Sequence, residues 1–268
     1  MQEIGSAAIP VRGGPPAHWP AGGGFTRFLP DSPLRRRNEY RLVNKYSSSM
    51  CRADSIWHRL ICLGVFAVAM GLLEAICVIY LRRLLPVENN LQVLPLGGHQ
   101  HIESIREACT IVMLLGVAWL AGINWRLRVA CFFFAFGIWD IFYYVGLWWL
   151  GHWPASLLTW DCLFLIPKPW HGPVLAPVLI SLYFVLGCCW IHAREMSDNP
   201  VRLSVAAVGS QILACTVWYW SFVKDSDWIH AHKYEGVSYS WGLLVTGILI
   251  GVAGLLSQRK SPHGMSPT

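Results

Sequence analysis

The stretch from residue 135 to residue 173 reads AFGIWDIFYYVGLWWLGHWPASLLTWDCLFLIPKPWHGP. It is apolar and aromatic enough to lie in a membrane, yet it holds two carboxylates, Asp140 and Asp161, each directly after a tryptophan. An aspartate near the centre of a spanning helix costs about 2.5–3.5 kcal/mol on insertion scales. We therefore expect both acids to face the protein interior, where each needs a partner or a proton.

The composition of the whole chain agrees with this stretch. Of the 268 residues, 54% are hydrophobic and only 13% are charged, whereas a soluble domain carries roughly 25% charged residues. Fifteen tryptophans, most of them beside apolar runs, are typical of an aromatic belt at a membrane interface. The composition predicts an all-α, polytopic transmembrane helix bundle.

About 20 mostly apolar residues are needed to cross a bilayer. Six runs of the sequence meet this length or come close to it: 57–81, 105–123, 127–150, 173–192, 202–223 and 239–256. We expect a transmembrane domain over residues 56–257, a disordered basic cytoplasmic tail over 1–55, which is rich in Gly, Pro and Arg, and a short cytoplasmic tail over 258–268.

The Trp-rich segment 151–172 lies between the third and fourth runs and fits neither a span nor an ordinary loop. It is too polar and too rich in proline to cross the membrane, and too apolar for a solvated connection. We expect a short helix that either lies at the outer interface or re-enters the membrane, and the sequence leaves both open.

The basic residues predict the orientation. With the N-terminus inside, the inner segments hold fourteen Lys and Arg residues and the outer segments hold six. Such a bias predicts cytoplasmic N- and C-termini in the cell (inner) membrane. It also explains the formal net charge of +6 without a nucleic-acid partner. The expected partner is the lipid bilayer, and a homo-oligomer or a partner membrane subunit stays open.

With this topology, the acids inside or beside the spans gather in the outer half. Two tyrosines follow Asp140 at the helical spacings i+3 and i+4, where a hydroxyl can donate to its carboxylate. The predicted polar pocket consists of Glu74, Glu107, Asp140, Tyr143, Tyr144 and Asp161.

Histidines of the outer side give a second hypothesis, a divalent metal ion as cofactor. His99, Glu103 and Glu107 fall at steps of four, on one face of a helix, with His101 beside them. His230 and His232 form a His-x-His element, in which both rings point the same way in an extended chain. Imidazole and carboxylate together suit a borderline metal ion. The alternative is a solvated helix entry and a polar loop.

These residues favour binding or transport of a cation, a proton or a small solute in a buried acid and histidine pocket on the outer side. One alternative is a membrane-embedded enzyme, metal-dependent or not, that acts on a lipid-linked substrate. The other is an accessory or structural subunit of a membrane complex. Neither a G-x-S-x-G element nor a phosphate-binding P-loop occurs in the sequence.

Overall fold

The computed structural model describes residues 33–84, 100–196, 204–232, 234 and 236–257. The chain divides into two units, residues 1–45 and 46–268, and all that follows on packing concerns the second. The elements in chain order are α1 (Pro33–Leu84), α2 (Gln100–Ala121), α3 (Trp125–Gly151), β1 (Trp160–Phe164), β2 (Trp170–Pro173), α4 (Leu175–Met196), α5 (Val205–Val223), α6 (Ser226–His232) and α7 (Trp241–Leu256).

Five stretches are helical, long and apolar enough to cross a membrane: Trp57–Arg83, His101–Ala121, Trp125–Gly151, Leu175–Met196 and Val205–His230. They confirm the prediction of a multi-pass helical membrane protein. The sixth run forms α7, which has only 16 residues. At 1.5 Å per residue it is about 24 Å long, shorter than a typical hydrocarbon core.

The first helix begins earlier than expected. α1 starts at Pro33, so residues 33–55 of the expected tail are helical. Proline suits the first turn of a helix because its missing N–H has no partner there in any case, and the Leu and Arg residues that follow are good helix formers. Residues 1–32 and 258–268, the remainder of the two expected tails, lie outside the described residues.

The Trp-rich segment is not helical. Instead of the short helix expected over 151–172, Trp160–Phe164 and Trp170–Pro173 pair as antiparallel strands, with Asp161 opposite Gly172 and Cys162 opposite His171. Aromatic residues favour strands, and the prolines at 167 and 169 fall in the connection, where their missing N–H disturbs no ladder.

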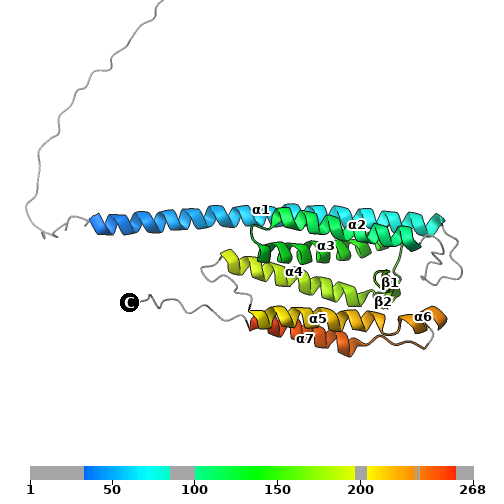
Figure 1. The fold of residues 1–268 in the computed structure, drawn as a ribbon. Coiled ribbons are helices and arrows are strands. Elements are labelled where there is room, and N and C mark those ends of the chain that lie inside the picture. Colours follow the sequence, from blue (N-terminus) through cyan, green and yellow to red (C-terminus); the bar gives the residue numbers. More distant parts are fainter. Residues whose placement is uncertain (1–32, 85–99, 197–203, 233, 235, 258–268) are drawn as a thin grey trace, which may run out of the picture. The chain divides into compact units, whose positions relative to one another are not determined.

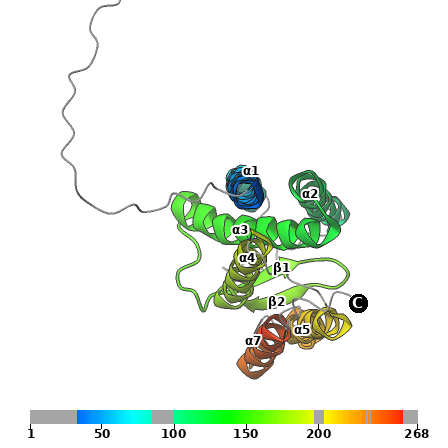
Figure 2. The same cartoon turned by 90° about the vertical axis from the view of Figure 1, so that its left-hand side faces the viewer.

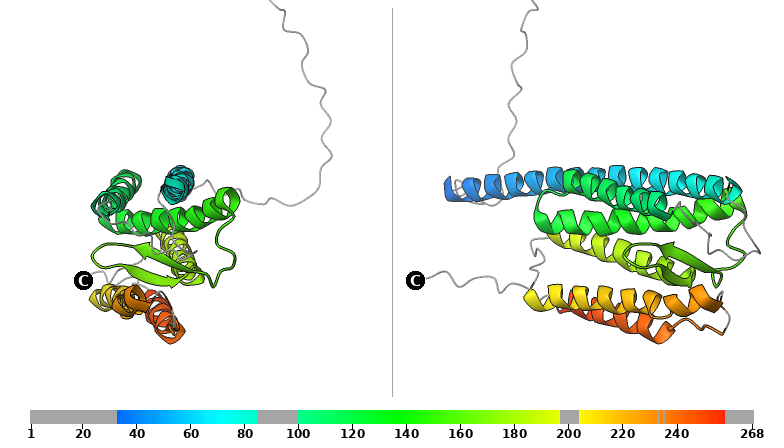
Figure 3. Two further views of the ribbon diagram at one scale, coloured as in Figure 1. Left: turned by 90° about the vertical axis from the view of Figure 1, so that its right-hand side faces the viewer. Right: turned by 45° about the vertical axis from the view of Figure 1, so that its right-hand side comes forward.

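The helices of the second unit pack around α3 (Figures 1 and 2). Viewed along the helices, α1 and α2 lie on one side of α3, α4 lies on the other, and the α5–α7 pair lies beyond α4 and the hairpin. The hairpin lies at the end of the bundle where α3 ends and α4 begins (Figure 3). We call the half of the membrane domain on this side the hairpin half.

Glycines set the close approach between helices. A Cβ on Gly71 of α1 would lie 2.5 Å from the carbonyl oxygen of Trp139 in α3, and a Cβ on Gly137 of α3 would lie 2.6 Å from the carbonyl oxygen of Ser181 in α4. Real Cβ atoms do not approach so closely, so α3 can contact both neighbours only because these positions carry no side chain.

The α5–α7 pair depends on side chains of α5 that bond to the backbone of α7. The indole Nε1 of Trp218 donates to the carbonyl of Leu244 at 3.1 Å, and Nε2 of Gln211 donates to the carbonyl of Gly251 at 2.8 Å. Gly247 lies directly against the Trp218 ring. The G-x-x-x-G pair at 247 and 251 therefore admits neighbouring side chains, as its spacing indicates.

Gly137→Ala should destabilise the protein, because the new methyl group must push α4 away from α3. Overpacking of this kind costs about 1–3 kcal/mol. Gly116→Ala is the matched control, since nothing lies within 4 Å of a Cβ there. Thermal unfolding in detergent measures both, and equal midpoints for the two variants would contradict the close α3–α4 contact.

Candidate functional site

Among the described residues of α1, α2, α3 and β1, five buried or half-buried acids lie in the hairpin half. Glu74 belongs to α1, Glu103 and Glu107 to α2, Asp140 to α3 and Asp161 to β1. Glu74, Glu107, Asp140 and Asp161 are each less than 10% exposed. The structure thus buries all four acids of the predicted pocket, and their partners separate them into small groups.

The first group is a cluster of two glutamates around one arginine. Arg106 donates from Nε to Oε2 of Glu103 at 3.0 Å and forms an ion pair with Glu74. The hydroxyl of Thr110 lies 3.2 Å from Oε2 of Glu74. The arginine that binds Glu74 of α1 therefore comes from another helix, α2.

The second group joins α2 to the hairpin connection. The backbone N–H of Leu165 donates to both carboxylate oxygens of Glu107, at 2.9 and 3.2 Å. Leu165 follows β1 directly, and Glu107 supplies the acceptor that its backbone N–H needs. Glu107 therefore holds the hairpin connection against the side of α2.

The third group is centred on Asp161 of β1. The hydroxyl of Tyr144 donates to its Oδ2 at 3.1 Å, and Nη2 of Arg82 lies 3.6 Å from its Oδ1. The guanidinium of Arg82 also lies 4.1 Å from the centre of the Trp153 ring. Burial raises the pKa of Asp161 to about 6, although Arg82 and Tyr144 both favour the ionised form.

The fourth group contains Asp140 and a residue that the sequence did not single out. The hydroxyl of Ser181 in α4 donates to Oδ2 of Asp140 at 2.8 Å. The two tyrosines expected to donate to Asp140 make other contacts: Tyr144 donates to Asp161, and the ring of Tyr143 packs against Tyr144 and Trp139. A serine in the apolar run 173–192 was the available signal for a partner.

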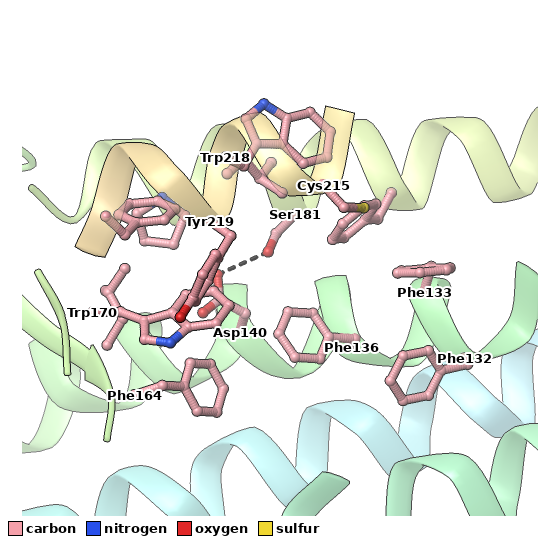
Figure 4. Close-up of a pocket in the computed structure, with 15 residues that line it drawn as sticks. Phe132, Phe133, Phe136, Asp140, Phe164, Trp170, Ser181, Cys215, Trp218 and Tyr219 are labelled. Atoms are coloured by element: carbon pink, nitrogen blue, oxygen red, sulfur yellow. Dashed lines mark hydrogen bonds between the residues drawn. The ribbon is translucent and has the colours of Figure 1, made fainter. Parts of the chain in front are cut away.

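Asp140 lines a cavity of about 200 Å³ between α3, α4 and α5 (Figure 4). Most of the lining is aromatic. The lining residues are Phe132, Phe133, Phe136, Asp140, Leu163, Phe164, Trp170, Pro177, Ile180, Ser181, Phe184, Cys215, Trp218, Tyr219 and Phe222. The cavity therefore combines one carboxyl group with a mostly aromatic wall.

A histidine on the hairpin contributes a separate polar contact. Nδ1 of His171 in β2 lies 3.0 Å from the hydroxyl of Tyr234, and the rings of His171 and His230 are 5.3 Å apart. Burial, reinforced by His230, lowers the pKa of His171 to about 4. His171 is 1% exposed, so it is a neutral imidazole at physiological pH.

The residues proposed as metal ligands are distributed differently. His99 lies outside the described residues, as does the side chain of His232. His101 and His230 are exposed, and Glu103 is paired with Arg106. In the described ranges, no three His, Cys, Asp or Glu side chains are arranged to hold a metal ion. The divalent-metal hypothesis stays a prediction that no contact among these residues supports.

The pKa values of Asp161 and His171 are shifted in opposite directions, so the pH dependence of stability tests both shifts. In an unfolded chain Asp has a pKa of about 3.9 and His about 6.5. Because the folded state raises the pKa of Asp161 to about 6, its contribution to stability falls as pH rises from about 4 to 6. Because the folded state lowers the pKa of His171 to about 4, its contribution rises from about pH 4 to 6.5.

Unfolding midpoints of Asp161→Asn and His171→Gln, each minus the wild-type midpoint at the same pH, should therefore have opposite slopes. The Asp161→Asn difference should increase between about pH 4 and 6, and the His171→Gln difference should decrease. Subtraction removes the groups that all three proteins share. Parallel pH profiles of the two differences would show that burial does not shift the pKa values of Asp161 and His171 in opposite directions.

The comparisons with known proteins give no further guide to this site. No protein-family model, no curated protein and no solved structure matches the chain.

Proposed function

We propose that the protein binds protons or a cation, or a small solute that carries them, at the buried carboxyl groups of the hairpin half. The observation that carries the proposal is an excess of acid. Five carboxyl groups face two arginines, Arg82 and Arg106, in the ion pairs of this half. If all five were ionised, the cluster would hold three uncompensated negative charges in a region with little water.

Of the three excess charges, one belongs to the pair of glutamates that shares Arg106, and the other two belong to Asp140 and Glu107. Glu74 and Glu103 share Arg106, and Asp161 lies beside Arg82. Asp140 accepts a hydrogen bond from a hydroxyl group, and Glu107 accepts one from a backbone N–H. Neither forms an ion pair with a Lys or Arg in the described part of the chain. Isolated buried charge is costly, so such a group takes up a proton or another cation.

We also propose that the hairpin half faces outward and that both termini are cytoplasmic in the cell (inner) membrane. The Lys and Arg bias of the sequence supports this orientation. Exchange of protons or cations would then take place with the outer side, and transport inward would need a second step through the inner half of the bundle.

Infrared difference spectroscopy tests the first proposal, because a protonated carboxyl group has a carbonyl band that an ionised one lacks. We expect a pH-dependent band in the wild type that loses separate components in Asp140→Asn and Glu107→Gln. Asp227→Asn is the matched control, since the side chain of Asp227 is 93% exposed. The proposal fails if the three variants give the same spectrum as the wild type.

Reporter fusions test the orientation. A fluorescent protein that matures only in the cytoplasm, fused after Thr268, should be bright, and one inserted in the connection between Asp225 and Trp241 should be dark. A periplasmic phosphatase at the same two points should give the reverse pattern. Bright fluorescence from the fusion between Asp225 and Trp241 would require the opposite orientation.

A further inference from the structure

The aromatic cavity around Asp140 continues into a longer groove. A groove of about 760 Å³ runs between α3, α4 and α5, and it shares five lining residues with the cavity: Phe133, Trp170, Phe184, Cys215 and Tyr219. Trp125 and Arg126 line its far end, at the start of α3. From Arg126 to Asp140, α3 rises about 21 Å at 1.5 Å per residue.

The groove opens along the side of the helices. Val129 and Ile212 line it from α3 and α5, and they are 47% and 62% exposed. In a chain that spans the membrane, such exposed apolar side chains face lipid. A ligand can therefore enter the groove sideways from the bilayer, without crossing the polar contacts of the hairpin.

Asp140 is the acidic residue at the end of this path. Its Oδ2 accepts from Ser181 at 2.8 Å, and no other hydrogen bond to its carboxyl is formed by a residue that the structure describes. The side chain is 6% exposed and borders the cavity. No Lys, Arg or His is among the described residues that line the cavity, so nothing there neutralises an ionised carboxylate.

The aromatic side chains around Asp140 also favour a positively charged ligand. Phe136, Phe164 and Trp170 surround the carboxyl group in the cavity (Figure 4). The face of an aromatic ring carries partial negative charge and attracts a cation. A carboxylate with several such faces is the combination by which proteins recognise ammonium groups, and the apolar groove suits an alkyl chain attached to one.

We propose that the cavity and groove bind an amphiphilic organic cation, with its ammonium group against Asp140 and its alkyl chain along the groove. This inference rests on the proposed function, because it names the class of cation that Asp140 takes. The ligand reaches the site from the lipid and not from water. A lipid anion with its headgroup in the cavity is disfavoured, because no cationic side chain is among the described residues that line the cavity beside Asp140.

Binding couples the cation to a proton. An arriving ammonium group, which keeps its own protons, needs the ionised form of Asp140; a proton on the carboxyl group therefore leaves to water when the cation binds, and charge balances. The titratable groups that face Asp140 are Tyr143 and Tyr144 on α3 and Asp161 on β1, and Cys215 and Tyr219 of α5 line the same cavity. The affinity for the cation should fall as the pH is lowered.

The test uses three probes with one tail and different headgroups. Titration calorimetry of the full chain in phosphatidylcholine nanodiscs, with empty nanodiscs subtracted, compares decylamine with decanol and decyl sulfate. We expect saturable decylamine binding at about one per chain, with weaker decanol binding and none for decyl sulfate. Equal binding of decylamine and decanol would overturn the proposal, because the headgroup would then play no part.

Two variants locate the site. Asp140→Asn keeps the shape and the hydrogen bond with Ser181 but not the charge, so decylamine binding should weaken at least tenfold while decanol binding stays unchanged. Cys215→Phe should fill the part shared by cavity and groove and weaken both probes. Asp227→Asn, an exposed Asp of α6, should change neither. Unchanged decylamine binding in Asp140→Asn overturns the inference.

The two proposals fail separately. If decylamine does not bind but the infrared bands of Asp140 and Glu107 still titrate, the acids take protons or small cations and the lipophilic ligand is wrong. If neither result is obtained, the acid cluster is a packing device, and the proposed function falls together with the ligand.

Discussion

The structure depends on one constraint: a carboxylate inside a membrane must obtain its hydrogen bonds from the protein. Four of the five acids meet this constraint with a donor from a different element, and Glu103 meets it with Arg106 of its own helix. Arg106 pairs with Glu74, and the backbone N–H of Leu165 donates to Glu107. Ser181 donates to Asp140, and Tyr144 donates to Asp161. These contacts join α1 to α2, α2 to the hairpin, α3 to α4, and α3 to β1, so the polar groups also determine which elements lie together.

The hairpin has a central place in this arrangement. It lies where α3 ends and α4 begins, and it receives contacts from Glu107 on one side and from Tyr144 and Arg82 on the other. Non-helical backbone at the depth of a membrane is tolerated where it is buried in protein. Glu107 contributes to this condition, since it accepts from the backbone N–H of Leu165, which follows β1 directly.

The sequence predicted the class of the fold and the burial of the acids but not how the acids are partnered. Hydropathy and length identify α1 to α5 because lipid selects apolar residues regardless of tertiary contacts. The donors to Glu74 and Asp140 come from other helices, Arg106 and Ser181, and helical spacing contains no information about neighbouring helices. The hairpin was missed because its apolar residues suit a short helix equally well, and only pairing with the Trp170 segment decides between the two.

The α5–α7 contact differs in kind from those in the hairpin half. Trp218 and Gln211 of α5 bond to carbonyl oxygens of α7, and those oxygens are present whatever residue occupies the position. What α7 contributes to α5 is a smooth surface, supplied by Gly247 against Trp218 and by Gly254 against Ser210, while Gly251 admits Tyr183 of α4. In evolutionary terms, the last helix is free to drift among apolar sequences as long as these glycines persist, whereas a change in α5 must preserve particular donors.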